Sequence, residues 1–150
     1  MVRRLAEEKA RAAAATVKGP AIVVGADTTV VLEGRVYAKP ESAEHAAEMF
    51  RHYSGRTHEV VTGIAVLRLP EGTLRVEHET TRVTFAPMRE EEIADYIASG
   101  EPFDKAGAYA IQGRGGRYVT RIEGCYFNVM GLPLARLYKI LREMGVAAAR

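Results

Sequence analysis

The chain has 150 residues, of which 47% are hydrophobic and 27% are charged, a composition typical of one globular domain with a buried core. Its formal net charge of +2 is too small to favour nucleic acid or a membrane surface as a partner, and no apolar stretch is long enough to cross a bilayer. Cys125 is the only cysteine, which excludes an internal disulfide and favours a reducing, cytoplasmic setting.

The first half of the sequence predicts two helices on either side of a strand region. Residues 2–17 are rich in alanine with interspersed charged residues, which is strongly helical composition. Residues 21–24 and 29–32 are apolar or β-branched and indicate two short strands, and the intervening residues 25–27 predict a break between them. Ser42 is a suitable N-cap for a helix that ends near residue 53.

The second half predicts a strand hairpin, two further helices and one more strand. The hairpin occupies residues 59–69 and 74–85, the strand residues 117–122, and the helices residues 89–98 and 133 onwards. Between them, residues 101–116 follow neither the helical nor the strand period and contain four glycines. Because helices and strands are interspersed, we expect an α/β or α+β fold in which helices flank a mixed sheet.

Two short segments combine a charged side chain with a residue that fixes the backbone. Asp27 follows a run of apolar residues and a glycine at position 25, and carboxylates in this position often lie at a ligand-binding edge of a sheet. An aspartate that only caps a turn fits this segment equally well. Lys39 precedes a proline, which suits a rigid cation for a phosphate oxygen, although isolated surface lysines are far more common.

Within the irregular segment 101–116, residues 103–113 contain an acid, a base, glycines and an amide. Asp104 could hold a metal ion or a water molecule, and Lys105 could offset phosphate charge. Gln112 could pair with the edge of a nucleobase, since its amide both donates and accepts hydrogen bonds. A loop with a purely structural role is the alternative interpretation.

Taken in order, six motifs resemble the successive motifs of the Maf family of nucleoside triphosphate pyrophosphatases. They are Ala-Glu-Glu-Lys-Ala at 6–10, Gly-Ala-Asp-Thr at 25–28, Ala-Lys-Pro at 38–40, Tyr-Ser-Gly-Arg-Thr-His-Glu-Val-Val-Thr-Gly at 53–63, Asp-Lys-Ala-Gly-Ala-Tyr-Ala-Ile-Gln-Gly at 104–113 and Gly-Leu-Pro-Leu at 131–134. The resemblance extends over essentially the whole chain. It implies an inosine-triphosphatase-like α/β fold with a substrate cleft, a homodimer, and a divalent metal cofactor, Mg²⁺ or Mn²⁺.

The resemblance also implies a role for individual residues. Asp27 would accept the proton of the attacking water, while Lys9 and Lys39 would neutralise the triphosphate. Asp104 and Lys105 would line the same cleft, and Asp27 or Asp104 could bind the metal.

Two further positions carry the family's preference for a nucleobase. Thr28 and Gln112 match the branch of the family that prefers dTTP and UTP, so the resemblance predicts hydrolysis of these nucleotides to the monophosphate and pyrophosphate.

Maf proteins begin with a small-residue strand, a Ser-x-x-Arg phosphate loop and an acidic residue, and no such segment precedes the first helix of this sequence. We therefore expect residues 1–150 to form a single Maf-like domain, truncated at the N-terminus relative to the family. Two alternatives to an enzyme stay open: a nucleotide-binding regulator of septum formation and cell division with little or no catalysis, and an inert dimerising fragment.

Overall fold

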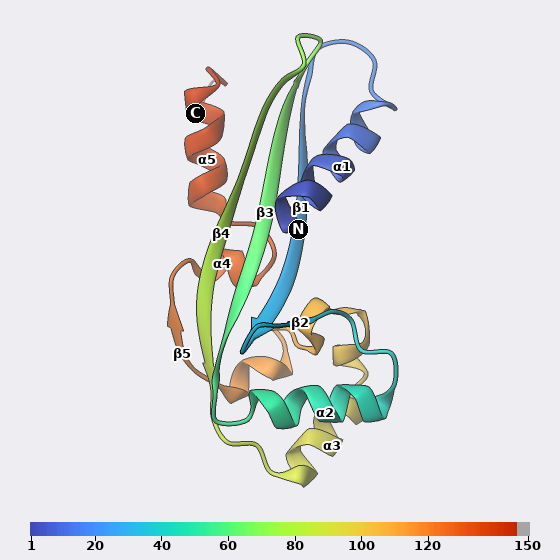
Figure 1. Ribbon diagram of the computed structural model, residues 1–150, viewed down its shortest axis with the longest axis vertical. Coiled ribbons are helices and arrows are strands. Elements are labelled where there is room, and N and C mark those ends of the chain that lie inside the picture. The colour runs from blue at the N-terminus through green and yellow to red at the C-terminus, as the bar shows by residue number, and fades with distance from the viewer. Residues whose placement is uncertain (147–150) are drawn as a thin grey trace.

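Three long antiparallel strands form the centre of the sheet in the computed structural model, which describes residues 1–146 (Figure 1). These are β1 (Ala21–Leu32), β3 (Thr57–Leu69) and β4 (Thr73–Phe85). Two shorter strands, β2 (Arg35–Tyr37) and β5 (Val119–Glu123), complete a sheet in the order β2-β1-β3-β4-β5. Every pair of neighbouring strands in this sheet is antiparallel, so the mixed sheet expected from the sequence is wrong. A parallel pair needs a long crossover between its strands, whereas β3 and β4 are joined by a short turn and form a hairpin.

Helices flank the sheet, which confirms the predicted α/β class. They are α1 (Val2–Ala14), α2 (Ala43–Tyr53), α3 (Glu90–Ala98), α4 (Tyr126–Val129) and α5 (Leu134–Glu143). Helices α1 and α5 lie along the upper part of the long strands in Figure 1, whereas α2 and α3 gather at the lower end. The predicted N-cap of α2 is confirmed, because the side chain of Ser42 accepts a hydrogen bond from the backbone N–H of His45 at 3.0 Å.

The predicted break at residues 25–27 is wrong, because β1 continues through it. The pairing between β1 and β3 is unbroken from Ala21 opposite Leu69 to Val31 opposite Glu59. Asp27 therefore lies in the interior of a strand, opposite Gly63, and not at the end of one. Gly25, the glycine that suggested a break, is instead required for the packing of α1.

Gly25 and Gly63 allow α1 to lie directly on the sheet. A Cβ atom at position 25 would lie 2.6 Å from the backbone nitrogen of Ala10 and closer still to the carbonyl oxygen of Ala6. A Cβ atom at position 63 would collide in the same way with the backbone of Val2. Helix and sheet backbones approach this closely only where the strands present no side chains.

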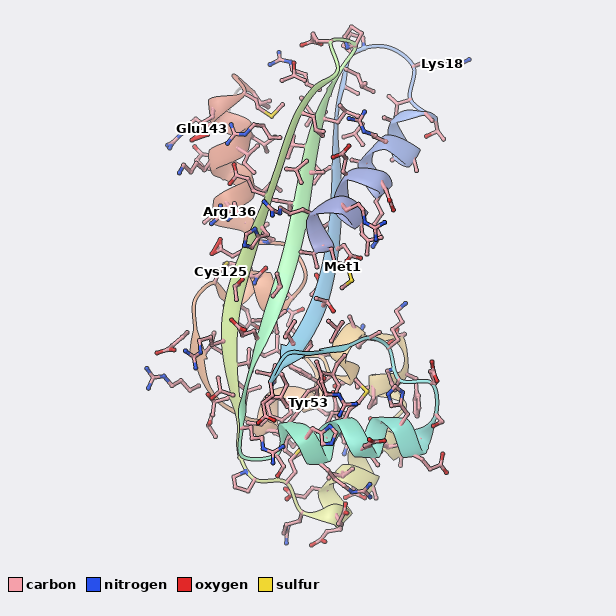
Figure 2. The ribbon with its side chains drawn as sticks, viewed as in Figure 1. Met1, Lys18, Tyr53, Cys125, Arg136 and Glu143 are labelled. Carbon is pink, nitrogen blue, oxygen red and sulfur yellow. The ribbon has the colours of Figure 1, made fainter. Side chains whose placement is uncertain are left out.

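The two faces of the sheet carry different helices. On β3, Ala65 and Leu67 pack against α1, and the alternating residues Ile64 and Val66 pack against Ile140 of α5. Towards the lower end of the molecule, the face that carries α5 is covered by α2, α3 and the irregular segment, around a core that includes Tyr53 (Figure 2). Since successive side chains of a strand point to opposite faces, this assigns a face to each residue of β1.

The irregular segment consists largely of short 3₁₀ helices, at Glu101–Asp104, Ala106–Ala108 and Arg114–Tyr118. Its centre is the carboxylate of Glu101, which accepts hydrogen bonds from the phenol of Tyr96 and from the backbone N–H groups of Arg114 and Gly115 at 3.0 and 3.1 Å. The glycine- and arginine-rich turn at residues 113–117 thus binds a carboxylate of the protein itself. Among the described residues no helix has the length and apolar character to span a membrane.

Candidate active site

An ion pair between α1 and β1 lies on one face of the sheet. Nζ of Lys9 is 2.9 Å from Oδ1 of Asp27 and 3.3 Å from the carbonyl oxygen of Ala26. The side chain of Asp27 is 17% exposed and that of Lys9 is 58% exposed. The carboxylate is therefore held against the sheet by a cation that solvent, or a ligand, can still reach.

A cavity of about 240 Å³ lies on the opposite face of β1. Thr28 forms one wall, and the irregular segment and the turn after α4 form the others. The lining residues besides Thr28 are Lys105, Ala106, Tyr109, Ala110, Ile111, Gln112, Val129, Met130 and Gly131. Sites for whole small molecules usually occupy about 300–1,000 Å³, so this cavity has the size to hold part of a nucleotide.

A short chain of hydrogen bonds continues from this cavity into the protein. Oγ1 of Thr28 lies 2.9 Å from Oγ1 of Thr62 on β3, and the hydroxyl of Thr62 lies 3.2 Å from the carbonyl oxygen of Asn128 in α4. Thr62 and Asn128 are fully buried. Thr28, the polar side chain of β1 that lines the cavity, is therefore hydrogen-bonded to buried polar groups on the side away from the cavity.

Lys39 and Lys105 lie on two loops that contact each other. The backbone N–H of Gly107 donates to the carbonyl oxygen of Ala38 at 3.2 Å, which brings the loop of Lys39 against the loop of Lys105. Lys39 is exposed. Lys105 lines the cavity, and its Nζ is 3.8 Å from Oδ1 of Asp104. Asp104 is 77% exposed and is not part of the cavity wall.

Tyr109, which lines the cavity, contacts a buried histidine. Its hydroxyl lies 2.7 Å from Nε2 of His58, whose ring also packs at 4.7 Å, centroid to centroid, against Tyr53. Burial lowers the pKa of His58 to about 4 and raises the pKa of the Tyr109 hydroxyl. The histidine is thus neutral near pH 7, and it positions Tyr109 without contributing a charge.

The described residues contain no group of three or more His, Cys, Asp or Glu side chains that could enclose a metal ion. A divalent ion that binds phosphates needs fewer protein ligands, since Mg²⁺ is commonly held by one or two carboxylates together with phosphate oxygens and water. Asp27 can supply one such carboxylate, because its side chain is 17% exposed and can be reached by an ion. Asp104 offers a second carboxylate at a more exposed position.

The structure brings five of the seven residues singled out in the sequence into two groups, and Lys39 and Asp104 lie outside both. Lys9 and Asp27 lie together on the α1 face, while Thr28, Lys105 and Gln112 lie together around the cavity on the other face. Three residues of the site were not singled out from the sequence: Tyr109, Thr62 and Asn128. For the last two a signal was present, because each is a polar residue inside an otherwise apolar run.

These features define an α/β protein with a cavity of mixed polar and apolar lining, which includes Lys105, on one face of β1 and a lysine–aspartate pair on the other face. The chain belongs to the family described as Maf-like protein, which matches residues 1–144.

Relatives in this family are similar along nearly the whole chain. A dTTP/UTP pyrophosphatase of Carboxydothermus hydrogenoformans is 51% identical over 94% of this chain and 75% of its own length. The dTTP/UTP pyrophosphatase of Koribacter versatilis is 55% identical over 96% of this chain and 73% of its own. The dTTP/UTP pyrophosphatase of Moorella thermoacetica is 53% identical over 97% of this chain and 74% of its own length. The predicted family is confirmed.

Proposed function

We propose that this chain is a nucleoside triphosphate pyrophosphatase that hydrolyses dTTP and UTP to the nucleoside monophosphate and pyrophosphate. The observation that carries the proposal is the position of Asp27, next in sequence to a cavity residue and 2.9 Å from a lysine. Relatives about 50% identical bear the name of this activity.

Asp27 has the properties of a base for the attacking water. Its carboxylate is partly shielded and oriented by Lys9, and a carboxylate within reach of a water can take its proton as the water attacks. The water oxygen forms a bond to the α-phosphorus while the bond from that phosphorus to the α–β bridging oxygen breaks. The proton passes to Asp27, and pyrophosphate leaves with the electron pair of the broken bond.

One substrate would contact both groups of residues. Asp27 and Thr28 are neighbours on β1, and their side chains lie on opposite faces of the sheet. A nucleotide with its base in the cavity beside Thr28 would therefore extend its phosphates past β1 towards Asp27. The base and the scissile bond would then lie on opposite faces of one strand.

The lysines would offset the charge of the triphosphate. Lys105 at the rim of the cavity and Lys39 on the adjoining loop are both solvent-accessible, and Lys9 stands beside the proposed base. Fixed cations of this kind stabilise charge that develops on the leaving group. Asp27 or Asp104 would hold Mg²⁺ or Mn²⁺ together with phosphate oxygens, and the bound ion would supply further charge neutralisation and a more acidic water.

The single cysteine and the small net charge support a cytoplasmic protein that does not bind nucleic acid, and the family resemblance supports a homodimer. Gel filtration with light scattering tests the last of these.

Pyrophosphate release from dTTP, UTP, CTP, dATP and GTP, with Mg²⁺ or Mn²⁺, tests the activity. We expect turnover of dTTP and UTP that falls by about a hundredfold or more in Asp27→Asn, the usual loss when a general base is removed. Asp95→Asn, on the exposed surface of α3, is the matched control and should be unaffected. Tight nucleotide binding without any turnover would instead favour the nucleotide-binding regulator.

A further inference from the structure

The direction of each hydrogen bond in the chain behind Thr28 follows from simple counting. A carbonyl oxygen can only accept, so the contact between Thr62 and the Asn128 carbonyl uses the single hydroxyl hydrogen of Thr62. Thr62 then has only lone pairs to offer to Thr28, 2.9 Å away. Both contacts are satisfied together only when Thr28 donates to Thr62.

Asn128 is anchored firmly enough to impose this direction. Its side-chain Nδ2 lies 3.0 to 3.1 Å from the carbonyl oxygens of Val60 and Glu79 and from Oγ1 of Thr81. The reversed amide would bring its oxygen against two carbonyl oxygens, so the orientation is unambiguous. The hydroxyl of Thr81 in turn donates to the carbonyl oxygen of Cys125 at 2.8 Å, which ties the start of α4 to β4.

We propose that Thr62, held by Asn128, is a positioning residue that fixes the Thr28 hydroxyl as a hydrogen-bond acceptor towards the cavity. With its hydrogen directed at Thr62, Thr28 can present only lone pairs to a ligand. Thr28 lines the cavity, and Gly131 has no side chain there that could cover its hydroxyl; a Cβ atom at 131 would already lie 3.7 Å from Oγ1. The matching ligand group is an N–H donor.

This inference rests on the proposed function and specifies how the base would be selected. The imide N3–H of uracil and thymine is a donor, whereas N3 of cytosine carries a lone pair at the same position of the ring. In the same pose, cytosine would place a lone pair against the lone pairs of Thr28. A polar group left unpaired in this way weakens binding more than a lost apolar contact does.

Binding of non-hydrolysable α,β-methylene analogues of UTP and CTP, measured by calorimetry, tests the inference separately from catalysis. We expect the wild-type protein to bind the uridine analogue at least about tenfold more tightly than the cytidine analogue. In Thr62→Val the Thr28 hydroxyl can rotate, so this preference should fall by about three- to tenfold, the worth of one hydrogen bond. Thr62→Ser restores the hydroxyl and should restore the preference.

Thr57→Val is the matched control. Its hydroxyl lies 2.7 Å from that of Thr84 on the same pair of strands, but neither residue lines the cavity. This variant should keep the wild-type preference.

Three results would overturn the inference: equal binding of the two analogues by the wild type, binding of neither, or an unchanged preference in Thr62→Val. A preference that responds to Thr62 as expected, in a protein that releases no pyrophosphate, would contradict the proposed hydrolysis and leave this inference standing.

Discussion

Nζ of Lys9 and Oδ1 of Asp27 lie 2.9 Å apart although 17 residues separate them in the chain. The contact exists because α1 lies on the sheet at the two glycines of β1 and β3, which brings the middle of the helix over the interior of a strand. Helix position and carboxylate orientation are therefore coupled, and several measurable consequences follow from that coupling and from the buried polar groups around it.

Lys9→Met should reduce kcat/KM for UTP by about ten- to a hundredfold, because it removes a cation beside the proposed base. Thermal stability should change little, since ion pairs with one exposed partner contribute less than about 1 kcal/mol. Steady-state pyrophosphate release and a melting curve check both parts. Lys18→Met, an exposed lysine in the turn after α1, is the control, and an unaltered kcat/KM in Lys9→Met would remove this lysine from the mechanism.

Gly25→Ala should destabilise the protein by roughly 3 kcal/mol, because the new methyl group collides with the backbone of α1. For a chain of this size that corresponds to a fall in Tm of roughly 6–12 °C. Gly34→Ala is the comparison: its φ is +80° but nothing lies within 4 Å of the added Cβ, so only the cost of a left-handed backbone, about 1 kcal/mol, applies. Equal melting temperatures for the two variants would show that the contact with α1 is not tight.

His58 should make the protein less stable in mild acid. Its pKa is about 4 in the folded state against an ordinary value of 6.5, so the unfolded chain binds more protons between these values. The free energy of unfolding should fall as the pH drops from about 6.5, by roughly 3 kcal/mol in total, and level off below about 4. Urea titrations across this range should show a flatter profile for His58→Gln, whereas His78→Gln, at an exposed position, should follow the wild type.

Glu101 should produce a separate loss of stability at lower pH. Burial raises the pKa of this carboxyl, but hydrogen bonds from Tyr96, Arg114 and Gly115 outweigh burial and leave it below 4.5. Its contribution is therefore present above about pH 4.5 and is lost as the pH falls through the lower, folded-state pKa.

Glu101→Gln should lower the free energy of unfolding at pH 7 by about 1–3 kcal/mol, and the difference from the wild type should shrink at pH 3. Exposed Glu48 on α2 supplies the control, Glu48→Gln. A constant difference between Glu101→Gln and the wild type at both pH values would exclude the carboxylate as the cause.

The sequence was sufficient to predict elements whose signals are local. The alanine-rich first helix, the Ser42 N-cap and the hairpin of β3 and β4 all depend on composition or spacing within a few residues. The family motifs were equally accessible, because they follow one another in order along the chain. The proposed catalytic and specificity positions could be named for the same reason.

Features that depend on distant packing could not be predicted in this way. Gly25 was interpreted as a break because nothing near it in the sequence reveals that a helix lies on top of it. That error also concealed the arrangement of the site, since only an unbroken strand places Asp27 and Thr28 on different faces. Thr62 and Asn128 gave a faint signal, but their connection to Thr28 exists only in three dimensions.

The position of Asp27 and Thr28 on one continuous strand also constrains which sequence changes the site can accept during evolution. On the proposed function, replacing the side chain at 28 would alter which base is accepted and leave the surroundings of the Asp27 carboxylate unchanged, because the two side chains lie on opposite faces. The same arrangement tolerates no slippage, because moving β1 by one residue against β3 would exchange the two side chains between the faces. A substitution at position 28 therefore keeps every side chain of β1 on its face, whereas an insertion or deletion in β1 would not.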